Sequence, residues 1–140
     1  MEKEIIKITL VEDSETNVKL MKKWFSKITP ENIEIELSTF PNGEDFIENS
    51  KKDPKHIDIL ITDYNMPKKN GLDVIKYCKE ECIHKKETLI IVISGELGEE
   101  IRKSCVMAGA NLYIEKPFEP KDLQLNLKKI MNDILEKRNK

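Results

Sequence analysis

Residues 57–71 read Ile-Asp-Ile-Leu-Ile-Thr-Asp-Tyr-Asn-Met-Pro-Lys-Lys-Asn-Gly, a short apolar run followed by an aspartate and a turn-forming segment. The run Ile57–Thr62 is apolar apart from Asp58, which is typical of a central parallel strand that is buried on both faces. The segment Asn65–Gly71 is rich in residues that favour turns. We therefore predict a buried strand that delivers the carboxylate of Asp63 to its carboxyl end.

Short apolar runs alternate with longer amphipathic stretches along the rest of the chain. The predicted strands are Ile5–Val11, Ile33–Phe40, Ile57–Thr62, Leu89–Ile93 and Leu112–Ile114. Apolar residues recur at helical spacing between and after these strands, which predicts helices there, including a short one over Gly43–Asn49. The expected helix ends are marked by Ser14 as a cap and by Pro30, Gly109 and Pro120. This alternation predicts one open α/β domain with a parallel sheet, and Ile33–Phe40 is expected near its edge.

Polar residues follow four of the predicted strands, at the point where each strand ends. They are Glu12 and Asp13, Asp63, Ser94 and Gly95, and Lys116 and Pro117. Each is an ordinary loop or cap residue by itself, but the carboxyl ends of parallel strands meet at one edge. Clustered carboxylates repel unless a hard cation such as Mg²⁺ (or Mn²⁺) binds them, and a lysine ammonium suits a phosphoryl oxygen. The set predicts phosphoryl transfer to an aspartate nucleophile.

Four motifs in this order resemble the response-regulator receiver domains of two-component signalling. Residues 63–71 are similar to D-x-x-M-P-x-x-x-G and residues 108–118 to A-G-A-x-x-Y-x-x-K-P-F, while Leu10–Asp13 resembles the acidic pair and Ser94 stands where the family has Ser or Thr. The likeness runs nearly end to end. It implies a flavodoxin-like (βα)5 three-layer sandwich with parallel sheet order 2-1-3-4-5, and a receiver domain over residues 5–136 without an output domain.

The resemblance also implies a role for each residue of the site. Asp63 is expected to be the phosphoacceptor, and the metal ligands are expected to be Asp13, Asp63, the backbone carbonyl of Asn65 and, through water, Glu12. Ser94, Gly95 and Lys116 would bind the phosphoryl group, Ser94 and Tyr113 would form the switch pair, and Met66, Pro67, Gly71 and Pro117 would be structural, with a cis Lys116–Pro117 bond. Glu12 stands in place of a more frequent Asp, and Gly95 in place of a frequent Ala.

The function implied by the family is a phosphorylation-dependent switch rather than an enzyme that turns over a diffusible substrate. A histidine kinase or His-containing phosphotransfer protein would be the donor. A downstream protein would bind through the fourth helix, the fifth strand and the fifth helix. The sequence is equally compatible with a stand-alone protein and with a fragment of a hybrid kinase.

Two further residues are expected to set how long the phosphoryl group persists. Asn65 lies two residues past Asp63, and Glu96 lies two residues past Ser94. Both positions flank the path of a water in line with the phosphorus. A similar Asn and Glu pairing is found in chemotaxis-type receivers, which lose phosphate quickly, whereas the alternative for Glu96 is a cap of the following loop.

Composition excludes several other classes of function. A formal net charge of -2 provides no basic field for nucleic acid, and the apolar runs are too short to cross a membrane. The N-terminus lacks the pattern of a secretory signal, so a cytoplasmic location is expected. Three cysteines cannot all pair within the chain, which favours a reducing compartment, and the spacing of Cys78, Cys82 and His84 matches no usual zinc pattern.

Two rival functions use the same chemistry. A Mg²⁺-dependent phosphohydrolase also forms an aspartyl phosphate, but its Asp-x-Asp motif carries a second acid where this chain has Asn65. A degenerate receiver would be a pure interaction module that never takes phosphate. All five residue types of the receiver site are present here, which favours phosphorylation.

Overall fold

The computed structural model describes residues 2–82, 87–95, 98–116 and 119–139, in which strands and helices alternate from one end to the other. The strands are β1 (Glu4–Val11), β2 (Ile33–Phe40), β3 (Ile59–Asp63), β4 (Leu89–Ser94) and β5 (Leu112–Glu115). The helices are α1 (Glu15–Ile28), α2 (Gly43–Lys52), α3 (Gly71–Glu81), α4 (Glu99–Ala108) and α5 (Pro120–Arg138).

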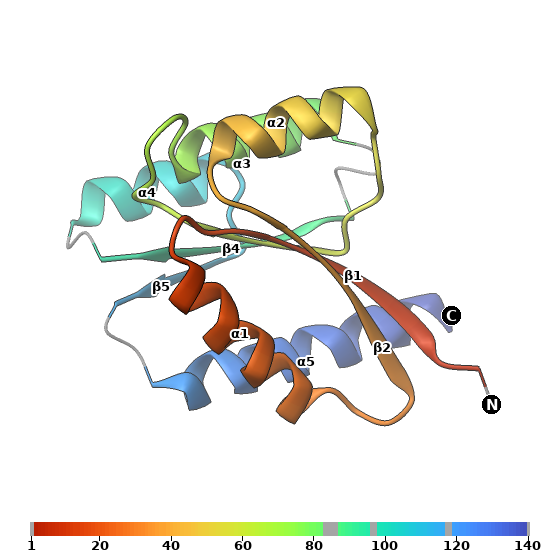
Figure 1. Ribbon diagram of the computed structural model, residues 1–140. Helices are drawn as coiled ribbons and strands as arrows, with labels where there is room; N and C mark the ends of the chain where they lie inside the picture. Colours follow the sequence, from red (N-terminus) through yellow and green to blue (C-terminus); the bar gives the residue numbers. More distant parts are fainter. Residues whose placement is uncertain (1, 83–86, 96–97, 117–118, 140) are drawn as a thin grey trace.

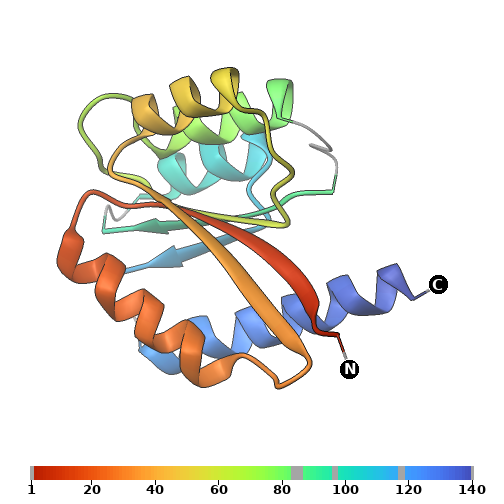
Figure 2. The same cartoon turned by 45° about the vertical axis from the view of Figure 1, so that its right-hand side comes forward.

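The five strands form one parallel sheet in the order β2-β1-β3-β4-β5, with β3 at its centre (Figure 1). The predicted flavodoxin-like fold and strand order are therefore confirmed. Helices α2, α3 and α4 cover one face of the sheet, and α1 and α5 cover the other, as Figures 1 and 2 both show. The molecule is a three-layer sandwich.

Each face of the sheet has its own apolar core. On one face, residues of β1, β3 and β4 pack against Met21 and Phe25 of α1 and Leu123 and Leu127 of α5. The other core includes Phe46 of α2, and it is completed by buried residues of α3 and α4. Since neighbouring residues of a strand point to opposite faces, a strand that supplies both cores must be apolar at nearly every position.

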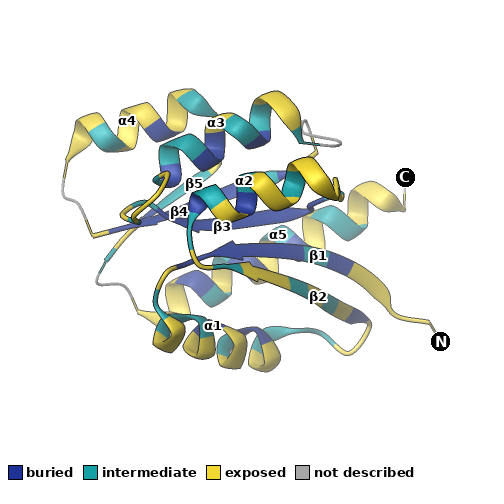
Figure 3. Ribbon diagram, turned by 45° about the horizontal axis from the view of Figure 1, so that its top comes forward, coloured by how far each residue is buried: buried dark blue, intermediate teal, exposed yellow. Residues whose placement is uncertain are grey.

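Burial differs between the centre and the edge of the sheet, as Figure 3 shows by colour. All five residues of β3 are buried, whereas exposed and less exposed residues alternate along most of β2. The pattern of Ile33–Phe40 predicted this edge position, because an edge strand of a parallel sheet is covered incompletely. Two of the three cysteines, Cys78 and Cys105, are buried among apolar neighbours.

The helix ends follow the predicted signals. The hydroxyl of Ser14 accepts the backbone N–H of Asn17 at 3.3 Å and caps α1. Pro120 occupies the first turn of α5, where its missing N–H costs nothing. Gly109 ends α4 with a φ of 124°, a backbone conformation that glycine adopts without steric strain.

Two of the boundaries differ from the prediction by more than one residue. Helix α2 continues to Lys52 rather than Asn49, and Lys51 and Lys52 in its last turn favour the helix because cations stabilise a helix C-terminus. Strand β3 begins at Ile59 rather than Ile57. The carboxylate of Asp58, not a strand carbonyl, accepts the backbone N–H of Lys7 at 2.8 Å, so regular pairing starts one residue later.

That carboxylate is the centre of a polar cluster at the amino-terminal edge of the sheet. Asp58 is 6% exposed, and its side chain also contacts Nε2 of His56 at 2.8 Å and Nη2 of Arg138 at 3.1 Å. Arg138 in turn donates to the carbonyl of Ile5 and to the carboxylate of Glu4, at 2.9 Å and 3.2 Å. These bonds attach the end of α5 to the start of β1.

Candidate functional site

Three carboxylates gather at the carboxyl edge of the sheet. Glu12 and Asp13 directly follow β1, and Asp63 is the last residue of β3, the neighbouring strand. Carboxylate oxygens of all three lie within 4.8 Å of one another. Glu12 and Asp63 are buried, whereas Asp13 is exposed and leaves the cluster open to solvent on one side. A hard cation can therefore enter from water and contact several oxygens at once.

The neighbours of Glu12 fix its carboxylate in place. One oxygen accepts the backbone N–H of Ser14, and the other accepts the side-chain N–H of Asn17, both at 3.2 Å. Burial raises the pKa of the Glu12 carboxyl, and the nearby charge of Asp63 adds to this, while the N–H of Ser14 acts in the opposite direction. The site thus contains a carboxylate that is costly to ionise without a compensating cation.

Asp63 carries the most direct cationic contact of the site. Its Oδ1 lies 3.3 Å from Nζ of Lys116, which directly follows β5. Burial nevertheless raises the pKa of Asp63 above its ordinary value of 3.8, and Lys116 only partly offsets this. The side chain of Asp63 is 7% exposed, while that of Lys116 is 33% exposed. The ammonium is therefore placed to pair with an anionic group attached to Asp63.

The segment after β3 wraps closely around Gly71. A Cβ built at Gly71 would lie 2.8 Å from the backbone oxygen of Asp63 and 2.8 Å from the Cα of Tyr64, so a glycine is required. The Gly71 N–H also donates to the carbonyl of Tyr64 at 2.9 Å. Lys68 and Lys69 adopt φ values of 53° and 73°, which are uncommon for residues other than glycine. This turn holds the backbone around Asp63 in a fixed shape.

The other residues predicted for this loop lie as follows. Met66 is partly buried and packs against the core on the α2–α4 side, while Asn65 and Pro67 are exposed. Asn65 follows Asp63 by two residues and so lies at the same carboxyl edge of the sheet. Its exposed position is compatible with the two roles predicted for it, in metal binding and in phosphate loss.

Ser94 and Tyr113 lie on the two strands beyond β3. Ser94 ends β4, is fully buried, and its carbonyl accepts the backbone N–H of Lys116 at 2.7 Å. Tyr113 lies on β5, is partly buried and packs against the same core as Met66. Gly95 is exposed, and a Cβ built there meets no atom within 4 Å. The predictions for Glu96 and Pro117 concern positions outside the described residues.

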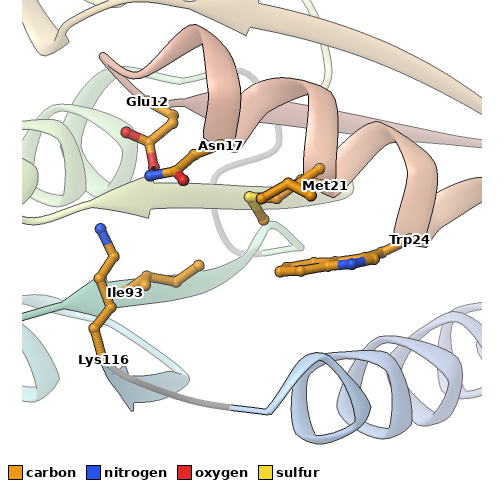
Figure 4. Close-up of a pocket in the computed structure, with 7 residues that line it drawn as sticks. Glu12, Asn17, Met21, Trp24, Ile93 and Lys116 are labelled. Atoms are coloured by element: carbon orange, nitrogen blue, oxygen red, sulfur yellow. Dashed lines mark hydrogen bonds between the residues drawn. The ribbon is translucent and has the colours of Figure 1, made fainter.

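Sequence reasoning missed two features of this region. The first is Asn17, which holds Glu12; its position in the first turn of the helix that follows the acidic pair is a signal that could have identified it. The second is a cavity beside the cluster, formed largely by α1 (Figure 4). Among the described residues, Cys78 and Cys82 belong to no zinc-like group, and the carboxylate cluster is the one group compatible with a metal ion. His84 lies outside the described residues.

The structure is a parallel α/β sandwich with clustered carboxylates, a hydroxyl and a lysine at its carboxyl edge. This combination defines a class of phosphoacceptor domain, and comparison with known proteins leads to the same class. The family model of the response regulator receiver domain matches residues 8–128. The chain belongs to this family. It is thus a receiver domain of two-component signalling, similar to the chemotaxis protein CheY, with an acidic pocket compatible with Mg²⁺ and aspartate phosphorylation. Receiver domains of this type are signalling switches.

Particular relatives span nearly the whole chain. The chemotaxis protein CheY1 of Helicobacter pylori is 33% identical over 128 residues, which cover 90% of this chain and 97% of that protein. The hybrid signal transduction histidine kinase C of Dictyostelium discoideum is 29% identical, over 88% of this chain and 10% of the kinase. A CheX–CheY–BeF3–Mg²⁺ complex from Borrelia burgdorferi is a structural neighbour with a TM-score of 0.73 and 26% identity, covering 90% of this chain and 89% of that one. No helix among the described residues is long and apolar enough to span a membrane.

Proposed function

We propose that this protein accepts a phosphoryl group on Asp63, with Mg²⁺ bound beside it, and transmits the signal by binding another protein. The observation that carries the proposal is the contact of Asp63 with Lys116 inside the three-carboxylate cluster. The phosphoryl group of an acyl phosphate brings new negative charge, and the ammonium together with a divalent cation compensates for it.

The residues present fit a magnesium ion. Mg²⁺ prefers oxygen ligands and commonly binds one or two carboxylates together with a phosphate and water. Asp13, Asp63 and the backbone carbonyl of Asn65 would hold it, and Glu12 would contact it through water. The fit is supported by the spacing of the carboxylate oxygens, all within 4.8 Å, and by the raised pKa of Glu12 and Asp63. When bound, the ion neutralises charge on the transferring phosphoryl group.

The chain's own residues account for the remaining steps. Lys116 orients a phosphoryl oxygen, and the buried hydroxyl of Ser94 turns toward the group after transfer. Tyr113, two strands from β3, changes its side-chain position in response. The downstream protein then binds to α4, β5 and α5. The partner in phosphoryl transfer is a histidine kinase or a His-containing phosphotransfer protein. Met66, Pro67 and Gly71 hold the loop, and Pro117 continues the chain after Lys116.

Labelling by a small phosphodonor tests this proposal. Acetyl phosphate with Mg²⁺ is expected to phosphorylate the intact protein once, with the adduct accumulating on Asp63 while the donor is in excess, and EDTA is expected to prevent it. Mass spectrometry of the intact protein and of its peptides measures both. Hydrolysis of the donor without any accumulated adduct on Asp63 would instead indicate a phosphohydrolase, and neither labelling nor hydrolysis would indicate a receiver that only binds partners.

The lifetime of the phosphoprotein is expected to be short. Asn65 is exposed beside the cluster, and the side chain at position 96 is also polar, so a water in line with the phosphorus finds hydrogen-bond partners. The Asn65→Lys, Glu96→Tyr double variant is expected to lose phosphate about tenfold more slowly, equal to about 1.4 kcal/mol in the barrier. Decay of the phosphoprotein after removal of the donor measures this. A long-lived wild-type adduct, or equal decay of both proteins, would contradict it.

A further inference from the structure

A cavity of about 390 Å³ opens beside the phosphoacceptor pocket, between α1 and the carboxyl ends of β4 and β5. Its described lining residues are Glu12, Asn17, Leu20, Met21, Trp24, Ile93 and Lys116. The volume falls within the range of about 300–1,000 Å³ that is usual for small-molecule sites. An occupant of this cavity would have to match the chemistry of both of its ends.

One end of the cavity is apolar. Trp24 and Met21 lie together along α1 at this end, and Ile93 of β4 lies opposite, as Figure 4 shows. Leu20 completes this wall and is 42% exposed, so the cavity can be entered from solvent at α1. A flat or compact apolar group placed here would bury its surface against an indole ring, which contributes more contact area than an aliphatic side chain.

The other end of the cavity is polar, and its carboxylate has no ammonium of its own. Glu12 and Asn17 lie here, with the ammonium of Lys116 facing them across the cavity (Figure 4). Lys116 is the one cation of this site among the described residues, and it is already paired with Asp63 at 3.3 Å. That pairing leaves the carboxylate of Glu12, which accepts only the neutral N–H groups of Ser14 and Asn17, without a cation in contact with it among the described residues. Charge complementarity therefore favours a cation over an anion.

We propose that this cavity binds a small organic cation, an amine, amidine or guanidine carried on a compact apolar or aromatic body. The cationic head contacts the carboxylate of Glu12, and the body packs against Met21 and Trp24. Because Glu12 belongs to the carboxylate cluster, the bound cation and Mg²⁺ compete for the same charge. This competition, which rests on the proposed function, makes such a cation an inhibitor of phosphorylation.

Trp24 provides a direct readout, since the chain has 1 tryptophan. The probes are benzamidine, benzyl alcohol and benzoate, which share a phenyl ring and differ in the charge of the head group. In EDTA and without a phosphodonor, fluorescence titration is expected to show benzamidine binding at least about tenfold more tightly than benzyl alcohol, because a charge-assisted hydrogen bond exceeds a neutral one. Benzoate is expected to be weakest, and added Mg²⁺ is expected to weaken benzamidine.

Two pairs of variants locate the site. Glu12→Gln removes the charge at the polar end and is expected to abolish the preference for benzamidine over benzyl alcohol. Glu15→Gln, in the first turn of α1 but outside the cavity lining, is expected to preserve that preference. Leu20→Phe narrows the apolar end and is expected to weaken all the neutral and cationic probes. Leu125→Phe, at a 61% exposed position of α5 outside the lining, is the matched control.

The wild-type probe series decides the proposal even if Glu12→Gln folds poorly. Equal binding of the three probes, tighter binding of benzoate, or binding that Leu20→Phe leaves unchanged would each overturn it. The phosphorylation assay without any amine tests the proposed function separately, so labelling of Asp63 together with no benzamidine binding would refute this inference alone. Benzamidine binding without labelling would refute the proposed function alone.

Discussion

Replacement of Asp63 by asparagine is expected to abolish labelling by acetyl phosphate completely while making the metal-free protein more stable. The loss follows because the amide is a poor nucleophile at the position that Lys116 contacts. The gain follows because burial raises the pKa of Asp63, so its ionised form is disfavoured in the folded state at neutral pH. Intact-protein mass spectrometry and thermal unfolding in EDTA measure the two effects.

The sign of the pH dependence provides a sharper test. Because the folded-state pKa of Asp63 is raised above its ordinary value of 3.8, its favourable contribution to stability is complete below that value. This contribution is lost as the pH rises through the folded-state pKa. The difference in melting temperature between Asp63→Asn and wild type is therefore expected to be small near pH 4 and to grow toward neutral pH. Each kcal/mol of difference in the free energy of unfolding corresponds to about 3 °C in melting temperature.

Metal binding is expected to reverse the order of stability of the two proteins, so that the wild type becomes the more stable. Mg²⁺ at a free concentration one hundred times its dissociation constant would stabilise the wild type by about 2.7 kcal/mol, and the variant by less. Asp133→Asn, an exposed carboxylate on α5, is the control and is expected to keep both labelling and the response to Mg²⁺. A lower melting temperature for Asp63→Asn in EDTA, or no response of either protein to Mg²⁺, would show that the three carboxylates do not act as one site.

Substitution of Gly71 by alanine is expected to destabilise the fold by about 2–3 kcal/mol and to slow phosphorylation. The added methyl group would lie 2.8 Å from two backbone atoms, of Asp63 and Tyr64, and backbone cannot move aside as a flexible side chain does. Relief of the overlap must shift Asp63 relative to Lys116. Urea unfolding measures the first effect, and the initial rate of labelling measures the second.

The matched control is Gly95→Ala, because Gly95 lies at the same edge of the sheet and a Cβ there meets no atom within 4 Å. Its stability is expected to remain within about 0.5 kcal/mol of the wild type. Equal destabilisation by both substitutions would mean that glycine is needed at these positions for a reason other than close approach. A fully stable Gly71→Ala protein would show that the turn around Gly71 can relax.

The sheet order was predicted from the resemblance to receiver domains, whereas the alternation of apolar runs was sufficient to predict a parallel sheet and the edge position of β2. It also predicted the convergence of Glu12, Asp13, Asp63 and Lys116, since topology alone brings the ends of β1, β3 and β5 to one edge. The start of β3 was wrong by two residues, because the hydrogen bond from Lys7 to the side chain of Asp58 joins residues 51 positions apart. Local sequence patterns carry no information about such a pairing.

The cavity beside the phosphoacceptor could not be predicted for a related reason. Met21 and Trp24 pack on the inner side of α1, but a helical stripe of apolar residues in a sequence cannot show whether its neighbours fill the space against it. That depends on the separation between α1 and the sheet. The role of Asn17 was missed for another reason: its place after the acidic pair was a signal, but a polar residue in a first helical turn is usually explained by capping.

The contacts of Arg138 have a consequence for how this domain can be joined to other sequences. By binding Glu4 and the carbonyl of Ile5, Arg138 brings the two ends of the described chain together, at the edge of the sheet opposite to Asp63 (Figure 2). A short peptide linking the ends would close the backbone into a ring without crossing the phosphoacceptor pocket. The fold is therefore suited to circular permutation, and to insertion within a loop of a host protein.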